Sequence, residues 1–401
     1  MSVQTHPDTA RNAPDSTVVP IIFAVAAGHF LNDLMQSLIP AAYPLLKTNL
    51  GLTFTQIGLI TFVFQGTASI LQPLVGFYTD KRPMPYAMAG GMASTGAGLI
   101  LLAHAQTFGL VLLSVALIGL GSAIFHPEAS RIARLAAGMR PGFAQSVFQV
   151  GGNAGTAVGP LAAAWIVLQR GQISIEWFAG IAMVGMILLA LVGRWFVTVG
   201  SVRALARKAR ARAASTLSPR IVRFGMFMLI LLIFSKFLYS VSFSSYYAFY
   251  LMERFALTEQ QALNCLFIFL AAVAAGTIIG GPIGDRIGRR RVILWSILGI
   301  LPLTAVLPWL PLIPTVIVAA LAGLILASAF PAMVVYAQDL MPQYTGMVAG
   351  LLFGLAFGIA AIGAAALGIL ADQIGIIAVY KICAFLPLIG LAAFFLPDVR
   401  H

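Results

Sequence analysis

Two segments, GFYTDK at residues 76–81 and GPIGDRIGRR at residues 281–290, indicate how the chain is organised. Each places an aspartate four residues after a glycine and a basic residue directly after the aspartate. Each also closes the second long apolar run of its half of the chain. A chain that repeats such a turn at equivalent points of its two halves indicates a duplicated helical unit, which is typical of membrane transporters.

Long apolar runs extend on both sides of these two segments. A run of about 20 apolar residues crosses the hydrocarbon core of a bilayer as a helix, and the alternating pattern of a membrane β-barrel is missing. The sequence therefore predicts an all-α membrane protein with twelve transmembrane helices in two pseudo-symmetric six-helix bundles. The predicted spans are residues 20–46, 56–79, 86–105, 107–130, 141–168, 175–197, 221–250, 260–284, 291–309, 312–338, 344–371 and 375–396.

The composition also indicates a membrane protein. Hydrophobic residues make up 60% of the 401 residues and charged residues only 9%, whereas charged residues average about 25% in soluble proteins. This excludes a soluble globular domain and a disordered chain. The net charge of +12 does not indicate nucleic acid, because nineteen of the 24 basic residues fall on one set of alternate loops and in the two tails. By the positive-inside rule, we expect both termini to be cytoplasmic.

Changes of composition predict five segments along the chain. The linker between the bundles contains no acidic residue, so we expect it to contact anionic lipid headgroups; a regulatory or partner-binding helix is the alternative. The two cysteines lie in apolar runs and indicate neither a disulfide nor a metal site, and we expect no metal and no cofactor. The segments are a cytoplasmic tail at 1–19, a bundle at 20–197, the basic linker at 198–220, a second bundle at 221–396 and a tail at 397–401.

The second of the two opening segments resembles the signature of the major facilitator superfamily. The first segment keeps part of that signature, with Pro83 at the position of its second glycine. Three further segments, HFLNDLMQS, SAIFHPEASRIAR and FAQSVFQVGGNAG, are similar to the fosmidomycin-resistance branch of the superfamily. The signature residues, which set conformational contacts in the family, are Gly76, Asp80 and Lys81 in the first copy and Gly281, Asp285, Arg286, Gly288, Arg289 and Arg290 in the second.

This resemblance implies a twelve-helix transporter of a bacterial inner membrane that functions as a monomer. It implies export of a small molecule in exchange for protons, with a phosphonate antibiotic such as fosmidomycin, or another drug, as the substrate. Proton-linked uptake of an anionic metabolite is the alternative within the same fold. An intramembrane enzyme or receptor is disfavoured, because the chain has neither a His-Glu-x-x-His metal motif nor a Walker phosphate loop.

Four polar residues share one face of the first predicted span. His29, Asn32, Asp33 and Gln36 recur at spacings of three and four residues, which places them together on a helix. A carboxylate near the middle of a span is costly in lipid and faces a polar cavity or a cation. We predict that Asp33 couples transport to protons and that the other three residues contact the substrate. A permanently paired structural aspartate is the alternative.

The end of the fourth span carries a second ionisable group. Glu128 and Arg131 lie three residues apart and can meet on one helical face, and Pro127 interrupts the backbone hydrogen bonds beside them. Glu128 and Arg131 follow His126, and histidine is the residue type whose ordinary charge change falls near physiological pH. We predict that His126, Glu128 and Arg131 take part in proton coupling. A salt bridge that locks one conformation is equally compatible with the spacing.

The fifth span carries a polar stripe and a glycine stripe. Gln149 and Asn153 follow helical spacing, and we predict that they contact the substrate. Gly155, Gly159 and Pro160 resemble the antiporter motif of the superfamily, although other positions of that motif differ. Glycines at this spacing also form ordinary packing surfaces between membrane helices. The resemblance favours exchange over symport.

The seventh span presents Lys236, Tyr239 and Tyr247 on one side. A lysine this deep in a span needs a counter-charge or an anionic ligand, and the aromatic residues offer apolar walls. We predict that all three bind the substrate, with Lys236 contacting its anionic group. Snorkelling of the lysine towards the cytoplasm is the alternative.

Overall fold

The computed structural model describes residues 17–52, 54–202, 204 and 217–398. The first sixteen residues of the predicted N-terminal tail, most of the basic linker and residues 399–401 lie outside this part of the chain. Almost every described residue is helical. The all-helical fold class predicted from the apolar runs is therefore confirmed.

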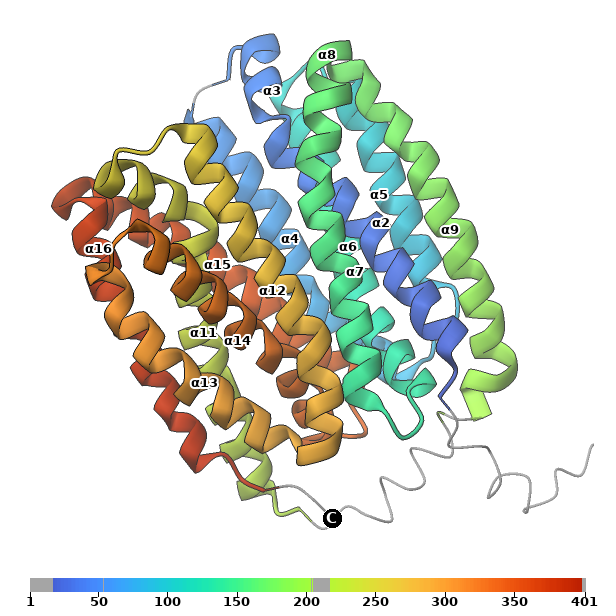
Figure 1. The fold of residues 1–401 in the computed structure, drawn as a ribbon. Coiled ribbons are helices and arrows are strands. Elements are labelled where there is room, and N and C mark those ends of the chain that lie inside the picture. Colours follow the sequence, from blue (N-terminus) through green and yellow to red (C-terminus); the bar gives the residue numbers. More distant parts are fainter. Residues whose placement is uncertain (1–16, 53, 203, 205–216, 399–401) are drawn as a thin grey trace, which may run out of the picture. The chain divides into compact units, whose positions relative to one another are not determined.

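Six long helices form the described part of the first half of the chain (Figure 1). Each of them falls on one predicted apolar run, and short helices α3 (Tyr43–Leu50) and α8 (Leu168–Arg170) lie between them. The long helices are α2 (Val19–Ala41), α4 (Phe54–Lys81), α5 (Ala87–Ala103), α6 (Phe108–Ala136), α7 (Pro141–Ala162) and α9 (Trp177–Trp195).

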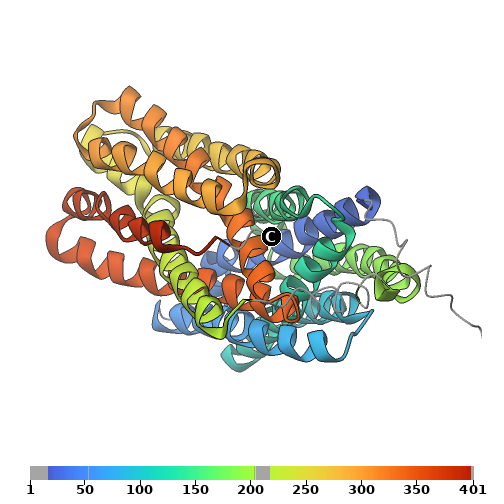
Figure 2. The same cartoon turned by 90° about the horizontal axis from the view of Figure 1, so that it is seen from below.

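The second half of the chain repeats this pattern, and Figure 2 shows the same helices from below. Its last predicted span is not a single α-helix, because α16 is followed by a 3-10 helix at Leu386–Phe395. Pro387 at the start of that segment lacks the N–H group that an α-helix would use. The helices are α11 (Pro219–Phe255), α12 (Glu259–Ile287), α13 (Arg289–Val306), α14 (Leu312–Leu340), α15 (Thr345–Ile374) and α16 (Ile376–Cys383).

Among the described residues, ten helical segments are long and apolar enough to cross a membrane. The remaining long helices are α5, which has 17 residues, and α7, whose sequence is interrupted by glutamine and asparagine. Large apolar side chains such as Phe62, Trp165 and Ile313 are 71%, 74% and 72% exposed. This outward position is expected of side chains that face lipid. The chain is therefore a multi-pass membrane protein.

Polar side chains determine where several helices begin. Ser218 Oγ accepts a hydrogen bond from the Ile221 amide at 3.4 Å at the start of α11. Thr258 and Gln261 form a reciprocal capping box at the start of α12. Such caps satisfy amides that have no partner within the helix. Local sequence therefore contributes to where these two helices begin.

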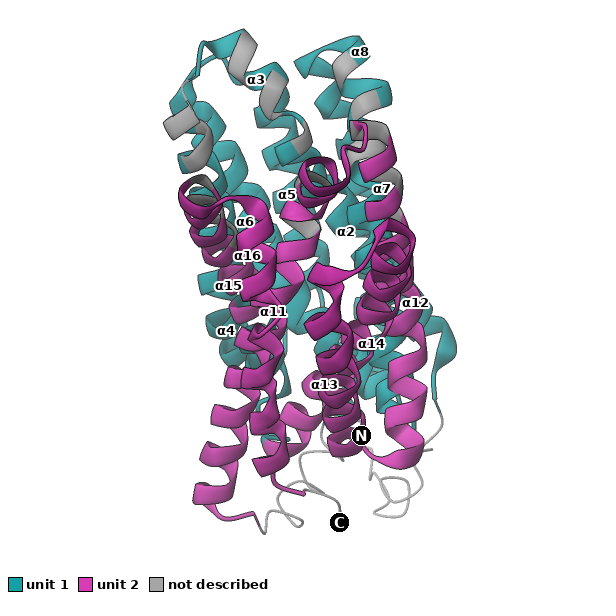
Figure 3. Cartoon of the chain, turned by 60° about the vertical axis from the view of Figure 1, so that its left-hand side comes forward, with its two compact units in different colours: residues 1–216, 341–354 teal, residues 217–340, 355–401 magenta. Residues whose placement is uncertain are grey.

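The chain divides into two compact units (Figure 3). Unit 1 comprises residues 1–216 and 341–354, and unit 2 comprises residues 217–340 and 355–401. Unit 1 therefore contains the first six long helices together with the beginning of α15. The first turn of α15 contacts polar side chains of unit 1, because the amides of Gly346 and Met347 donate hydrogen bonds to Asp80.

Close packing of α7 on α2 organises the interior of unit 1. An added Cβ at Gly155 would overlap the Phe30 carbonyl oxygen, and one at Gly159 would overlap the Ser37 side chain. Glycine permits two membrane helices to approach this closely. The third residue of the predicted antiporter-like motif is Pro160, and its side chain lies outside the described part of the chain. The two glycines hold the polar face of α2 beside α7.

Candidate functional site

Three ionisable side chains meet in the interior of unit 1. His29 and Asp33 lie one turn apart on α2, and His126 approaches them from α6. The Nε2 atoms of the two histidines are 3.2 Å apart. His29 Nε2 lies 3.3 Å from one Asp33 oxygen, and His126 Nε2 lies 3.5 Å from the other. The side chains are 3%, 15% and 1% exposed for His29, Asp33 and His126, respectively, and we call them the His–Asp–His cluster.

Backbone carbonyl groups decide which nitrogen of each histidine faces this cluster. His29 Nδ1 lies 2.7 Å from the Phe148 carbonyl oxygen, and His126 Nδ1 lies 3.0 Å from the Ser122 carbonyl oxygen. A carbonyl oxygen only accepts hydrogen bonds, so each Nδ1 carries the proton when the imidazole is neutral. Both Nε2 lone pairs then face each other and the Asp33 carboxylate. Three acceptor atoms converge, and this arrangement attracts a cation.

Aromatic rings enclose the two histidines. The Phe148 ring stacks on His29 with centroids 4.1 Å apart, and the Phe125 centroid lies 5.7 Å from the same imidazole. Phe353, in the part of α15 that belongs to unit 1, lies 5.5 Å from His126. These phenylalanines were missed in the sequence, because no polar character or spacing marks them. Phe125 directly precedes His126 and Phe148 directly precedes Gln149, and this adjacency to predicted site residues was the available signal.

Amide side chains surround the Asp33 carboxylate. Asn32 Nδ2 donates to Asp33 Oδ1 at 3.0 Å, and Gln36 Nε2 donates to the same oxygen at 3.5 Å. Asn32 Oδ1 and Gln149 Oε1 are buried without a hydrogen-bond partner among the described residues. Because such atoms are costly to leave unsatisfied, they are positions for water or a polar group of a substrate. Asn153 is half-buried one turn further along α7.

Glu128 and Arg131 form a bidentate ion pair within α6. Arg131 Nε donates to Glu128 Oε1 at 3.2 Å, and Nη2 donates to Oε2 at 2.5 Å. Both side chains are buried, and the Arg131 guanidinium lies 5.0 Å from the centre of the Phe196 ring. The helical spacing of three residues thus brings these two predicted residues together. His126 is not part of this pair, because its side-chain contacts include His29 and Asp33 of α2.

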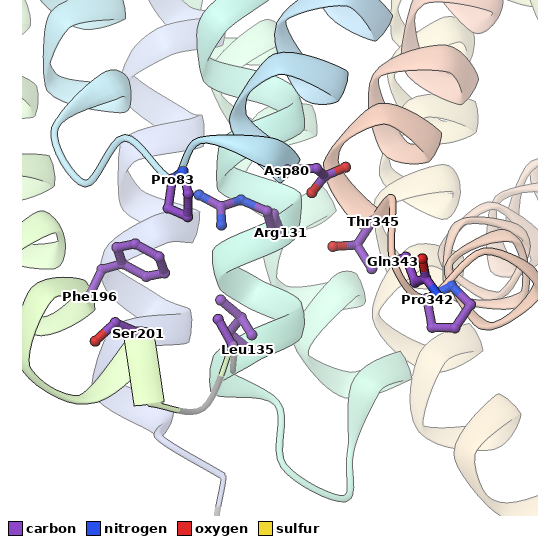
Figure 4. Close-up of a pocket in the computed structure, with 10 residues that line it drawn as sticks. Asp80, Pro83, Arg131, Leu135, Phe196, Ser201, Pro342, Gln343 and Thr345 are labelled. Carbon is purple, nitrogen blue, oxygen red and sulfur yellow. The ribbon is translucent and has the colours of Figure 1, made fainter. Parts of the chain in front are cut away.

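A cavity of about 210 Å³ lies beside this ion pair in unit 1 (Figure 4). Asp80, Arg131 and Phe196 contribute to its lining, together with Thr345 at the start of α15. Figure 4 shows the Asp80 carboxylate on the side of the cavity where α15 begins. The cavity is therefore bordered both by Asp80 of the first signature segment and by Arg131 of the buried ion pair of α6.

The first signature segment also caps α15. Asp80 accepts hydrogen bonds from the amides of Gly346 and Met347 at 3.1 and 2.9 Å. These amides belong to the first turn of α15, which has no partners for them, and a carboxylate interacts favourably with the positive end of the helix dipole. An added Cβ at Gly76 would overlap the Gly346 backbone, so the glycine permits this contact. Lys81 instead lies over an aromatic ring of its own helix.

The second signature segment makes different contacts in unit 2. Arg289 forms an ion pair with Asp339 at the end of α14, and Arg290 Nη2 donates to the Phe394 carbonyl oxygen at 3.1 Å. The basic residues of this copy therefore join α13 to two other segments. The other signature residues are Gly281, which is buried, Asp285, which is half-buried, Arg286, which is exposed, and Gly288, whose φ of 95° favours glycine.

Unit 2 contains a buried lysine on α11. Lys236 is 8% exposed, and its Nζ has no hydrogen-bond partner among the described residues. Nζ lies 5.8 Å from the centre of the Phe330 ring, which packs against Phe237 at 5.2 Å. Because Nζ itself is inaccessible, the lysine does not snorkel to the interface in this structure. A buried ammonium group without a carboxylate can be compensated by an anionic ligand.

Tyr239 and Tyr247 belong to an aromatic cluster of their own. The Phe243 ring lies between them, with its centroid 5.2 Å from each tyrosine ring. Tyr239 is 3% and Tyr247 0% exposed, and both belong to the apolar core of unit 2. The aromatic ring described next to Lys236 is instead that of Phe330, which packs against Phe237. The structure therefore does not join the three predicted residues of α11 into one site.

Comparison of the sequence with known proteins gives matches over its whole length. The family model of the Major Facilitator Superfamily matches residues 25–361 and 233–401. The chain is 50% identical over 406 residues to the fosmidomycin resistance protein of Escherichia coli strain K12, and the match covers 100% of both chains. It is 43% identical over 386 residues to the uncharacterized MFS-type transporter YfnC of Bacillus subtilis strain 168, covering 96% of this chain and 94% of that one.

Solved transporter structures share the fold. The Escherichia coli fucose:proton symporter FucP aligns with a TM-score of 0.73 and 16% identity, covering 95% of this chain and 99% of that one. The proton:xylose symporter XylE gives 0.72 and 15%, covering 96% and 97%. A human organic anion transporter gives 0.69 and 19%, covering 96% and 100%. Identities this low establish a common fold.

Proposed function

The chain belongs to the major facilitator superfamily of transporters, and we propose that it exports a small anionic molecule in exchange for protons. Its relatives and its fold are those of transporters rather than enzymes. The relative with 50% identity is named for resistance to fosmidomycin. A phosphonate drug of that kind is therefore the first substrate that we propose.

The anionic character of the substrate rests on the buried ammonium group of Lys236. Its Nζ lies within α11 without a hydrogen-bond partner among the described residues. A charged group at such a depth requires compensation, and a phosphonate or carboxylate would supply it through charge-assisted hydrogen bonds. The ring of Phe330 provides an apolar surface next to the ammonium group. This single observation favours an anion over a neutral or cationic drug.

For the exchanged cation, we propose a proton held by the His–Asp–His cluster. The converging acceptor atoms of His29, Asp33 and His126 support this choice. A proton between an imidazole nitrogen and the carboxylate forms a charge-assisted hydrogen bond. Asn32 and Gln36 donate to the carboxylate and hold its orientation. Access of water to the cluster, first from one side of the membrane and then from the other, would load and release the proton.

We propose a narrower role for the ion pair of α6 than proton relay. Glu128 and Arg131 already compensate each other through two hydrogen bonds, so neither group needs a proton for charge balance. The pair instead stabilises the end of α6 next to the cavity that Asp80 lines. The unsatisfied Gln149 oxygen and the half-buried Asn153 remain our candidates on α7 for contact with the substrate.

We further propose that the protein is a functional monomer in a bacterial inner membrane, with both termini in the cytoplasm. The distribution of basic residues along the sequence supports this orientation. Residues 198–220 contain six of those basic residues, and we propose that this linker contacts anionic lipid headgroups. The glycines Gly155 and Gly159 support exchange through their resemblance to the antiporter motif.

Transport by the purified protein in proteoliposomes tests the proposed substrate class. We expect the wild-type protein to move fosmidomycin and Lys236→Gln to lower the rate about tenfold or more, because the ligand loses a charged partner. Lys236→Arg should retain part of the activity. The matched control is Lys381→Gln, which alters an exposed lysine of α16 and should leave the rate unchanged. A wild-type rate in Lys236→Gln would contradict an anion site at this lysine.

A further inference from the structure

We propose that the His–Asp–His cluster is also a binding site for a divalent transition-metal ion, with Zn²⁺ as the best match. His29, Asp33 and His126 each offer one ligand atom, and these atoms lie within 4.8 Å of one another. Imidazole nitrogen and carboxylate oxygen are both common zinc ligands. The cluster therefore supplies three of the four ligands of a tetrahedral ion.

The distances between neighbouring ligand atoms are close to those around a tetrahedral ion. Zinc bonds of about 2.0–2.2 Å to nitrogen and oxygen place neighbouring ligands of a tetrahedron about 3.3–3.6 Å apart. In the cluster the two nitrogens lie 3.2 Å apart, His29 Nε2 lies 3.3 Å from one Asp33 oxygen and His126 Nε2 lies 3.5 Å from the other oxygen of the same carboxylate. An ion can therefore be accommodated with little movement of α2 or α6.

The outer contacts of the histidines also suit a metal ion. His29 Nδ1 and His126 Nδ1 are hydrogen-bonded to the carbonyl oxygens of Phe148 and Ser122. Metal-binding histidines commonly donate their second N–H group in this way, which fixes the tautomer and the orientation of the ring. Each Nε2 lone pair is consequently available to a metal ion without rotation of the imidazole. The carboxylate is oriented in the same manner by the Asn32 and Gln36 amides.

The set of donor atoms discriminates between metals. Mg²⁺ and Ca²⁺ prefer six or more oxygen ligands, and the cluster offers two nitrogens and one carboxylate. Imidazole suits Zn²⁺ and neighbouring ions such as Co²⁺ and Ni²⁺. Three protein ligands leave a fourth position for water or for an anionic group. We therefore expect selective binding of late first-row ions.

Occupancy of the cluster by a metal ion should inhibit transport. The ion would bind the atoms that hold the proton in the proposed exchange, and it would link α2 to α6 within unit 1. This consequence rests on the proposed function. Binding itself does not, because it depends only on the three ligand atoms and their geometry.

Titration of the purified protein tests binding directly, after removal of any polyhistidine tag that would bind the same ions. We expect calorimetry with Zn²⁺ to detect a site that is lost in the cluster variants, and Co²⁺ to give the visible absorption of tetrahedral coordination. His29→Gln, Asp33→Asn and His126→Gln should each weaken binding at least about tenfold. The matched control His104→Gln removes an exposed histidine that contacts Glu176 and should leave the affinity unchanged.

His126→Cys provides a second test in case a glutamine variant fails to fold. A cysteine thiolate is also a zinc ligand, so this variant should keep the ion, and its Co²⁺ complex should gain a sulfur-to-metal charge-transfer band. Wild-type affinity in all three variants of the cluster would overturn the proposal. A Co²⁺ spectrum of His126→Cys without the sulfur band would overturn it as well.

A transport assay at the same Zn²⁺ concentrations separates this proposal from the proposed function. Inhibition that follows the binding curve supports both. Binding of Zn²⁺ without any effect on transport supports the metal site and contradicts the role of the cluster in proton coupling. Proton-coupled transport in a protein that does not bind Zn²⁺ overturns the metal site and leaves the proposed function intact.

Discussion

The polar interiors of unit 1 and unit 2 differ in how their charges are compensated. In unit 1, Asp33 contacts two histidines, and Glu128 is paired with Arg131. In unit 2, the Nζ of the buried Lys236 has no hydrogen-bond partner among the described residues. A buried charge is unfavourable unless another charge or a ligand compensates it. The comparison suggests that unit 1 provides acceptors for a cation, whereas unit 2 provides a cation for an anionic ligand.

The two signature segments differ in a related way. In the first copy the acidic residue makes the contact between helices, because Asp80 accepts two hydrogen bonds from the start of α15. In the second copy the basic residues do so, because Arg289 pairs with Asp339 and Arg290 binds a carbonyl oxygen. Similar sequences therefore have different structural roles in the two units. In the first copy the neighbouring element is the start of α15, whose free amides bind an acidic residue. In the second copy it is the end of α14, where Asp339 binds a basic residue.

The largest effect should follow from neutralising the cation site of unit 1. Asp33→Asn keeps the size of the side chain but removes the charge that stabilises a proton beside two imidazoles. We expect proton-coupled exchange to fall about a hundredfold or more, while binding of the anionic substrate in unit 2 persists. The flux of radiolabelled substrate in everted vesicles measures the exchange, and equilibrium binding of the same substrate measures the affinity.

Glu176→Gln is the matched control for this prediction, because it neutralises an exposed carboxylate that contacts His104. Its exchange rate should equal that of the wild type. Undiminished exchange in Asp33→Asn would show that the acceptors of unit 1 are structural. Equal loss of exchange and of substrate binding would remove the functional difference between the two units.

A smaller effect, on stability, should follow from breaking the compensated ion pair of unit 1. Glu128→Gln leaves the buried Arg131 guanidinium without its hydrogen-bonded counter-charge, which costs about 3–5 kcal/mol. We expect a lower midpoint of thermal unfolding in detergent. Adding Arg131→Met to Glu128→Gln should restore part of the loss, because the uncompensated charge is then removed. No recovery in the double variant would indicate that the pair is not the source of the effect.

The smallest effect should separate the two signature segments. Asp80→Asn weakens the cap of α15, and loss of a helix cap costs about 0.5–2 kcal/mol. Asp285→Asn alters the equivalent aspartate of the second copy, which is half-buried whereas Asp80 is buried, and should lower the unfolding temperature less. Thermal unfolding of the two variants side by side measures the difference. Equal midpoints would mean that the two aspartates contribute alike.

The fold could be predicted from the sequence because lipid imposes a simple rule on every span. Each apolar run became a helix, since a chain in hydrocarbon must satisfy its own backbone hydrogen bonds. Two of the predicted spans are not single α-helices, each for a local reason. The first run divides near Pro40, so that α2 ends at Ala41 and α3 begins at Tyr43, and the last run continues as a 3-10 helix from Leu386. Apolar content alone does not reveal these changes.

The candidate site could be predicted only within single helices. Helical spacing placed His29 with Asp33 and Glu128 with Arg131, because residues three or four apart share a face. The contact between His29 and His126 joins residues 97 positions apart, and packing of α2 on α6 alone creates it. No metal site was expected from the sequence, because the two cysteines do not indicate one and the group formed by His29, Asp33 and His126 exists only after α2 packs on α6. For the same reason, spacing placed Tyr239 beside Lys236, although its described ring contacts lie in a separate core.

Simultaneous measurement of substrate and proton flux in proteoliposomes decides whether the protein exchanges an anion for protons. We predict that acidifying the outer solution accelerates efflux of fosmidomycin from the vesicles and that the lumen becomes acidic as the substrate leaves. Efflux that is faster when the lumen is the acidic side, or that does not depend on the proton gradient, would contradict the exchange.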